Sequence, residues 1–354
     1  MAETRKSIPV PGRGASANPP NRFERLSYEA DPQEDESGQP PKTQYLRDIS
    51  RSIIAYNDSP DIPFDASVNP YRGCEHGCIY CYARPTHEFL GFSAGLDFET
   101  RILVKEDAPE LLYQELSSPK WKPQILVMSG VTDPYQPIES RLQITRRCLE
   151  ILAEFRNPVG IITKNHLVTR DIDVLKRLAD FDAVSVSVSV TTLDAKLAHQ
   201  MEPRTSPPER RLAAIEELAA AGIPVGVMAA PVIPGLTDHE ITSIIAAAAR
   251  AGATQAGYVV LRLPYAVAGL FENWLEEHFP DRKNKVLAHI RDLRGGKLND
   301  PEFKSRMKGQ GVYADQIRSM FALACKRAGI AGNRTTLSIE HFRRPHGDQP
   351  SLFE

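Results

Sequence analysis

The feature that most constrains the fold is a regular alternation of strand-like and helix-like segments. Apolar or β-branched runs recur six times, and segments with helical periodicity fill most of the gaps. The runs cover residues 67–71, 125–129, 159–163, 183–190, 225–230 and 256–263. Repeated strand-then-helix units with buried strands predict a parallel sheet flanked by helices, either doubly wound or curled into a barrel.

The helices are best marked in two places and then continue alone towards the C-terminus. Residues 140–155 carry apolar side chains at helical spacing, and residues 208–221 begin with a proline and end before a glycine. After residue 263 the strand signal stops. Three further helices are predicted at residues 268–279, 282–293 and 313–328.

Composition divides the chain into four parts. With 42% hydrophobic and 25% charged residues among 354, most of it is ordinary globular sequence. Residues 1–42 are polar and rich in Pro, Gly and Ser, so we expect an arm that is disordered or draped on the surface. We assign residues 43–265 to the core, 266–342 to a helical extension and 343–354 to a flexible tail. We find no signal segment or membrane-spanning run and expect a cytoplasmic protein.

The net charge of −2 conceals a basic C-terminal third. Residues 281–346 contain fifteen Lys or Arg against six Asp or Glu, a difference of nine positive charges. Such a region suggests a polyanionic partner. The alternative is a pair of solvated helices whose charge is balanced elsewhere in the fold.

Three cysteines follow directly on the first predicted strand. Cys74, Cys78 and Cys81 are separated by three and then two residues, so their thiolates can converge on one inorganic centre. A four-coordinate site built from them is one ligand short. In either parallel architecture ligands bind at the C-terminal edge of the strands, which places this loop at the active face.

Other readings of the cysteines need a fourth ligand. For zinc the nearby candidate is His76, which lies inside the loop and would be strained into binding with its neighbours. For a ferredoxin-type cluster the candidates are Cys148 and Cys325. Both fall beside apolar positions of predicted helices and are expected to be core residues.

The motif Cys-x3-Cys-x2-Cys, with the aromatic Tyr80 before the third cysteine, resembles the signature of the radical S-adenosylmethionine (SAM) superfamily. The resemblance implies that the thiolates hold three irons of a 4Fe-4S cluster and that SAM chelates the fourth. Reductive cleavage of SAM would then give a 5′-deoxyadenosyl radical that abstracts hydrogen from a substrate. It also implies an electron donor such as flavodoxin or ferredoxin.

Two longer segments resemble the spore photoproduct lyase-like branch, especially an uncharacterised bacterial group within it. They read Asn-Pro-Tyr-Arg-Gly-Cys at residues 69–74 and Thr-Asp-Pro-Tyr-Gln-Pro at residues 132–137. The resemblance covers residues 60–345 and implies a partial, six-unit (β/α) barrel of the TIM type. The dedicated cysteine by which that lyase returns hydrogen has no counterpart between residues 129 and 135, so the same lesion and relay are doubtful.

The resemblance also suggests which residues hold SAM. Thr132 and Asp133 stand where relatives place the acceptors of its ammonium group, and Lys164 would pair with its carboxylate. Ser189 is the last of three serines at period two, with Ser185 and Ser187, and matches a serine that contacts SAM. Ile233 lies in an apolar segment expected to pack on adenine. The alternatives are an ordinary Asp-Pro turn and small hydroxyls tolerated in a packed barrel.

The substrate is suggested only by weaker signals. Aromatic and basic side chains near predicted strand ends could line a pocket that stacks a base: Tyr71, Tyr82, Tyr135, Tyr258, Arg262 and Tyr265. Arg204 and Arg211 could reach a carboxylate, although an exposed arginine at a helix start is the default expectation for both.

The tail adds a separate hint. Residues 349–353, Gln-Pro-Ser-Leu-Phe, resemble peptides by which bacterial DNA-processing enzymes bind the replication sliding clamp. These signals favour an enzyme acting on nucleic acid, with damaged or modified DNA as the leading example. Modification of RNA, a protein or a small molecule is the first alternative. The second is a non-catalytic iron-sulfur protein that senses redox state or binds nucleic acid.

Overall fold

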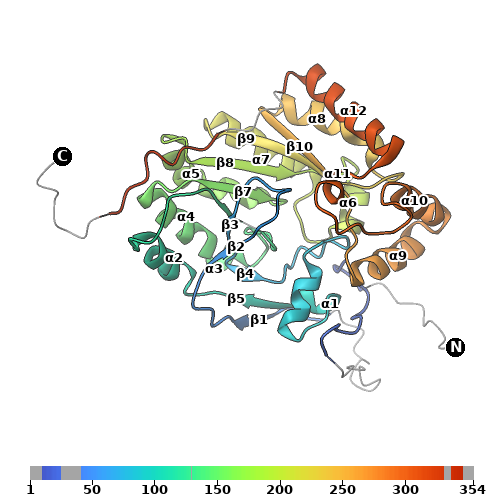
Figure 1. Ribbon diagram of the computed structural model, residues 1–354, viewed down its shortest axis with the longest axis horizontal. Helices are drawn as coiled ribbons and strands as arrows, with labels where there is room; N and C mark the ends of the chain where they lie inside the picture. Colours follow the sequence, from blue (N-terminus) through green and yellow to red (C-terminus); the bar gives the residue numbers. More distant parts are fainter. Residues whose placement is uncertain (1–9, 25–40, 129, 331–335, 346–354) are drawn as a thin grey trace, which may run out of the picture.

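The computed structural model describes residues 10–24, 41–128, 130–330 and 336–345, and its centre is one seven-stranded sheet (Figure 1). The strand order is β10-β9-β8-β7-β6-β3-β2, in which β2 (Ile54–Tyr56) pairs antiparallel with β3 and all the other neighbours are parallel. The six parallel strands are β3 (Ala66–Val68), β6 (Leu126–Met128), β7 (Val159–Thr163), β8 (Val184–Ser189), β9 (Val225–Val232) and β10 (Gln255–Val260).

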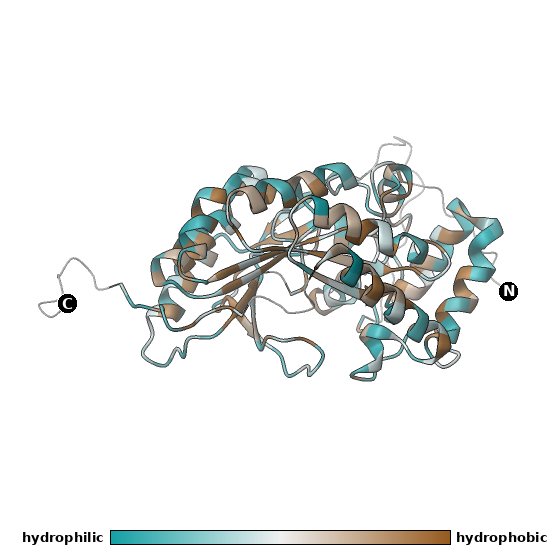
Figure 2. Cartoon of the chain, turned by 90° about the horizontal axis from the view of Figure 1, so that it is seen from above, coloured by the Kyte–Doolittle hydropathy of each residue, from teal (hydrophilic) through white to brown (hydrophobic). Residues whose placement is uncertain are grey.

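Helices follow the strands and cover the outer face of the sheet (Figure 1). They are α2 (Ala108–Ser117), α4 (Ile144–Phe155), α5 (Ile172–Ala179), α7 (Pro208–Ala220) and α8 (Ile241–Arg250). The short helix α3 (Glu139–Leu142) precedes α4, and α6 (Ala195–Met201) packs on the cysteine loop. Viewed from above, the apolar residues gather in the central strands (Figure 2). The predicted partial (β/α)6 barrel is therefore confirmed, and in the described residues no pairing between β10 and β3 closes it.

The strand β8 shows how the sequence builds both faces of the sheet. Its residues alternate Val and Ser, and Val184, Val186 and Val188 are fully buried in the main core. The serines point to the opposite face because successive side chains of a strand alternate. One face therefore anchors helices while the other presents hydroxyl groups.

A second, smaller sheet lies beside the barrel and was not anticipated. It has the order β1-β5-β4, with β1 (Gln44–Arg47), β5 (Arg101–Val104) and β4 (Tyr71–Arg72). Between the cysteines and β5 lie the 3-10 helix η1 (Arg84–Leu90) and α1 (Leu96–Thr100). Because β3 belongs to the barrel and β4 to the small sheet, the segment that enters the cysteine loop is fixed by both.

Two predicted elements are divided in the structure. The strand predicted at residues 67–71 ends at Val68, and the chain re-pairs at Tyr71 with the small sheet. The single helix predicted over residues 140–155 is broken at Gln143, whose φ is 51°. The break lets the buried carboxylate of Glu139 accept a hydrogen bond of 3.1 Å from the Thr145 amide, in the first turn of α4.

The C-terminal helices pack on two different cores. They are α9 (Ala266–His278), α10 (Pro280–Asp292), α11 (Ser305–Lys308) and α12 (Gly311–Ala328). α12 adds Ala314 and Ile317 to the main core, whereas α9 and α10 share an apolar cluster with Ile79 and Tyr80 of the cysteine loop. In the described part of the chain, no helix has the length and apolar character needed to cross a membrane.

Candidate active site

The cysteine loop is a tight structure that depends on its glycines. Gly73 and Gly77 have φ angles of 78° and 67°, a conformation that strains any residue with a side chain. A Cβ atom on Gly77 would also lie 2.7 Å from Oε2 of Glu99. The loop therefore closes against its surroundings, and Cys74 and Cys78 are only 7% and 8% exposed.

The three thiols occupy an environment that suits a metal cluster. Burial raises the pKa of each thiol, so they would be protonated without a cationic partner. The neighbouring backbone amides of Asp133, for Cys74, and of Ala83 and Arg84, for Cys81, partly offset this rise in pKa. Amide donors and buried thiolates are the surroundings in which iron-sulfur clusters are held, so the residues present fit this group.

The zinc alternative loses its fourth ligand. Nδ1 of His76 lies 3.3 Å from Oδ2 of Asp133, and Nε2 lies 3.3 Å from Nδ2 of Asn165. Both ring nitrogens therefore face groups other than the thiols. Within the described residues, no three His, Cys, Asp or Glu side chains converge on a single metal ion. A cluster differs in this respect because each thiolate binds a different iron.

Asp133 anchors the barrel side of the loop. Its Oδ1 accepts from the Tyr135 amide at 2.9 Å and the Thr163 hydroxyl at 2.7 Å, and its Oδ2 accepts from the Lys164 amide at 2.7 Å. Although burial opposes the charge, His76 and these donors lower the pKa of the Asp133 carboxyl. With His76 at Oδ2, the carboxylate has four hydrogen-bonding partners.

Lys164 directly follows β7, and its side chain reaches residues that follow β8 and lie near the end of β9. Its Nζ contacts the Thr191 hydroxyl and the Ala230 carbonyl at 3.0 Å each, and Oε1 of Glu202 at 3.2 Å. Burial, with Arg211 nearby, lowers the pKa of Lys164 to about 8. The ammonium also stands 5.6 Å from the centre of the Tyr80 ring, beside the cysteine loop.

Glu202 and Arg211 form a buried ion pair behind Lys164, which corrects the expectation of an exposed Arg211. The guanidinium is 0% exposed and donates to Oε2 of Glu202 and, at 3.1 Å, to the Ser189 carbonyl. Oε1 of Glu202 accepts a hydrogen bond of 2.6 Å from the Thr191 hydroxyl. Sequence reasoning missed Glu202 and Thr191, although a charged pair nine residues apart beside a strand end was a signal that could have found them.

The other predicted SAM residues are buried, at strand ends or in the apolar cluster beside the loop. Ser189 is 6% exposed at the end of β8, and Thr132 is 8% exposed in the turn after β6. The Tyr80 hydroxyl lies 3.2 Å from that of Thr191. Ile233 is fully buried in the apolar cluster that contains Tyr80. The structure thus brings Tyr80, Lys164 and Ser189 around Thr191, and Ile233 against the same cluster.

The candidate substrate residues separate into two groups. Tyr71, Tyr135 and Tyr258 are buried, and the hydroxyls of the first two bond Glu139 and Asp171, so they pack in the core. The exposed group consists of Tyr82, which is 52% exposed, and Tyr265, which is 67% exposed. Cys148 and Cys325 are buried in the main core, as predicted.

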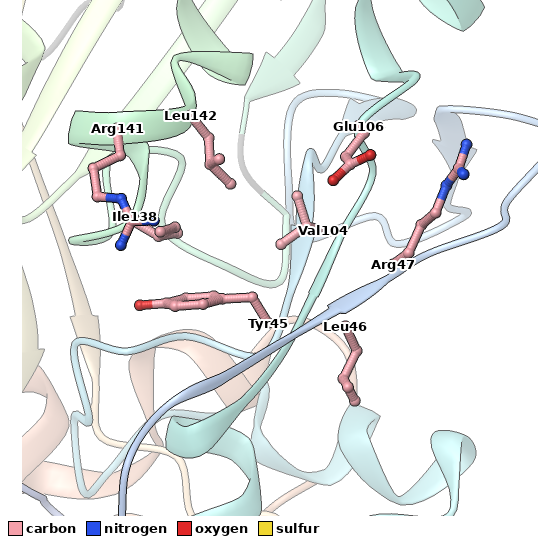
Figure 3. A pocket seen from close by; sticks show the side chains of 8 residues that line it. All are labelled: Tyr45, Leu46, Arg47, Val104, Glu106, Ile138, Arg141 and Leu142. Carbon is pink, nitrogen blue, oxygen red and sulfur yellow. The ribbon is translucent and has the colours of Figure 1, made fainter.

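A small cleft lies on the outer side of the loop. It has a volume of about 110 Å³ and is lined by Tyr45, Leu46, Arg47, Val104, Glu106, Ile138, Arg141 and Leu142 (Figure 3). The Tyr45 hydroxyl donates to Oε1 of Glu75 at 3.0 Å, and Arg204 lies 3.2 Å from the same oxygen. The cleft is smaller than a usual ligand pocket. Its polar residue Tyr45 supports the cysteine loop by bonding to Glu75.

Comparisons with known proteins agree with this geometry. The chain matches the model of the radical SAM superfamily over residues 68–248. An uncharacterised protein of Mycobacterium tuberculosis (strain H37Rv) is 36% identical over 250 residues, covering 70% of this chain and 72% of that protein. One of Methanocaldococcus jannaschii is 31% identical over 173 residues, covering 49% of this chain and 62% of the relative.

Among solved structures, spore photoproduct lyase complexed with dinucleoside spore photoproduct is similar in fold. Its TM-score is 0.58 at 16% identity, covering 80% of this chain and 79% of that one. The chain therefore belongs to the radical SAM superfamily, and its fold is that of spore photoproduct lyase. As a radical SAM enzyme, it uses a 4Fe-4S cluster and SAM and needs an electron donor.

Proposed function

We propose that this enzyme abstracts hydrogen from a nucleic-acid substrate, with Cys74, Cys78 and Cys81 as the ligands of its cluster. When bound, the cluster and SAM supply hydrogen abstraction through reductive cleavage of SAM. The convergence of the loop residues Cys74 and Cys78, both buried, and Cys81, which is partly buried, supports this ligand set. The surrounding barrel keeps water away from them.

The remaining site residues orient SAM. The ammonium of Lys164 lies near the Cys78 thiol, where it would pair with the SAM carboxylate. Ser189 and Thr132 supply hydroxyls, and the carbonyls of the Asp133 turn receive the ammonium group. Tyr80 and Ile233 form an apolar wall suited to adenine.

The observation that carries the nucleic-acid proposal is a cation with no salt bridge of its own in the described structure, because the nearby Asp61 pairs with Arg306. Arg262 follows the end of β10, and its guanidinium carbon lies 5.5 Å from the centre of the Tyr82 ring, next to Cys81. In the described structure its Nε has no hydrogen-bond partner, and Nη1 reaches only the Met307 sulfur at 3.7 Å. Burial and the neighbouring Arg306 lower the pKa of Arg262.

A phosphate group would satisfy this cation, and the exposed Tyr82 ring beside it offers a surface on which a base can stack. The Tyr265 ring is exposed as well, but one of its faces is covered by the guanidinium of Arg22, 3.6 Å from the ring centre. Spore photoproduct lyase, which shares the fold, was solved with a dinucleoside photoproduct. Part of the basic C-terminal region is already neutralised, since Lys283, Arg306 and Arg318 pair with acidic residues. Arg262 is therefore more informative than the overall charge.

DNA binding by an Arg262→Gln variant tests the proposal. We expect affinity for a short fluorescein-labelled DNA, single-stranded or duplex, to fall about fivefold and the salt dependence to lose about one phosphate contact. Fluorescence anisotropy measures both quantities. Arg177→Gln, on the exposed face of α5, is the matched control and should bind like the wild type. Equal affinities of all three proteins would favour a protein or small-molecule substrate instead.

The sliding clamp remains a separate proposal, because residues 349–353 lie outside the described residues. A pull-down with the clamp, comparing the full chain with one that ends at Asp348, tests it. Retention of the full chain alone supports a DNA-associated role. Equal retention of both chains removes this part of the argument.

A further inference from the structure

A segment far away in the sequence lies on the outer face of the cysteine loop. Ala15 is 1% exposed and packs in the apolar cluster that contains Cys78, Ile79 and Tyr80. Gly14 passes so close that a Cβ atom on it would lie 1.8 Å from the Gly77 carbonyl oxygen. Only glycine permits this approach.

The carboxylate of Glu99 joins this segment to the loop. Glu99 belongs to α1 and is fully buried. Its Oε2 accepts from the Gly14 amide at 3.0 Å, and its Oε1 accepts from the Ala15 amide at 2.8 Å and from Nη2 of Arg84 at 2.5 Å. Such charge-assisted bonds are the stronger kind, and burial raises the cost of losing any of them.

Arg84 continues the connection into the loop. Its side chain is 0% exposed and donates to the carbonyls of Gly77 at 3.2 Å and Cys78 at 3.0 Å. It also donates to the carbonyl of Gly95 at 2.9 Å. One continuous network therefore runs from the amides of Gly14 and Ala15 through two buried charges to the backbone between the first two cysteines.

The segment is held at further points along α1. Nη1 of Arg13 donates to the Glu99 carbonyl at 3.0 Å, and the Leu96 amide donates to the Ala17 carbonyl at 3.3 Å. A Cβ atom on Gly95 would lie 2.0 Å from that same carbonyl oxygen, which marks a second close approach of the two backbones. The contact is thus extended rather than a single bond.

From this network we infer that Glu99 is a positioning residue for the cluster and that residues 13–17 are the cover it holds in place. The cover fixes the backbone of the loop and keeps water from its outer face. Solvent access and hydrogen bonding around the sulfurs tune the reduction potential and stability of a cluster. The inference concerns the cofactor site and does not depend on the nature of the substrate.

Two substitutions and their matched control test the inference. Gly14→Ala forces the cover away from Gly77, and Glu99→Gln removes the charge that binds both amides and Arg84. Gly269→Ala in α9 makes the same chemical change where nothing lies within 4 Å. After anaerobic reconstitution, the readouts are iron per chain, the midpoint potential of the cluster, and its bleaching rate in air.

We expect the two variants to bleach severalfold faster than the wild type and to shift the potential, while Gly269→Ala matches the wild type. If both variants match the control in all three readouts, the inference is wrong. Should either variant fail to fold, amide hydrogen exchange on the wild type decides. Residues 13–17 should be protected with the cluster bound and exchange faster after its removal. Exchange at the rate of an unstructured peptide in the cluster-bound protein contradicts the inference.

Discussion

The cysteine loop is held from two sides by buried carboxylates that serve different purposes. On the barrel side, Asp133 lies in the turn after β6 and Glu202 follows α6, and both organise residues proposed to hold the cofactors. On the outer side, Glu99 organises only backbone and Arg84. The reactive face and the protective face are thus built from separate parts of the chain and can be perturbed separately.

The largest effect is expected on the barrel side, from Glu202→Gln. The substitution leaves Arg211 buried without its anion, which should cost about 3 kcal/mol of unfolding free energy. Lys164 also loses one of its three anchors, so we expect SAM to bind about tenfold more weakly. Urea unfolding and equilibrium binding of SAM to the reconstituted protein measure the two effects.

Glu217→Gln is the matched control for that substitution. Glu217 is on α7 but partly exposed, and it pairs with His166 away from the thiols. Its loss should change stability by under about 1 kcal/mol and leave SAM binding unaltered. If Glu202→Gln binds SAM as tightly as this control, Glu202 has no part in positioning Lys164.

A smaller effect, confined to stability, is expected on the outer side from His87. Its ring lies between Phe92 and Phe98, both nitrogens lack hydrogen-bond partners in the described structure, and burial lowers its pKa to about 4. The unfolded chain takes up a proton below about pH 6.5 but the folded one resists it. Stability should therefore fall as the pH drops from about 6.5 towards 4.

For His87 this linkage corresponds to about 2 kcal/mol lost between pH 7 and pH 5. A His87→Phe variant should lack that share of the loss, which denaturant unfolding at the two pH values detects. Identical pH dependence in the two proteins would mean that the folded state accepts the proton at His87. Such a result would argue against the exclusion of water from the outer side of the loop.

The barrel could be predicted from the sequence because its signals are local. The strand limits at residues 159–163 match β7, and the helix at 208–221 differs from α7 by one residue. The small sheet was missed because β4 and β1 have two and four residues, too few for a periodic pattern. Tertiary pairing, rather than local propensity, creates such strands.

Site residues that belong to one short motif could be predicted from the sequence. Those whose partners are distant in the sequence could not. The three cysteines lie within eight residues, but Glu99 meets Gly14 across 85 positions of the sequence. The composition of residues 1–42 gave no sign that Ala15 is buried, because one small apolar residue against a distant loop leaves no periodic pattern. Likewise, Arg211 is buried because it pairs with Glu202. The sequence signals that mark the start of a helix do not predict such a pair.

The most direct test of the account measures the cluster and SAM cleavage together. The wild type, Cys78→Ala and Cys325→Ala are reconstituted anaerobically, reduced, and given SAM. We predict about four irons per chain and release of 5′-deoxyadenosine for the wild type and for Cys325→Ala, whose cysteine lies in the core. Cys78→Ala should lose both. Equal amounts of 5′-deoxyadenosine from Cys78→Ala and the wild type, or none from the wild type, would contradict the account.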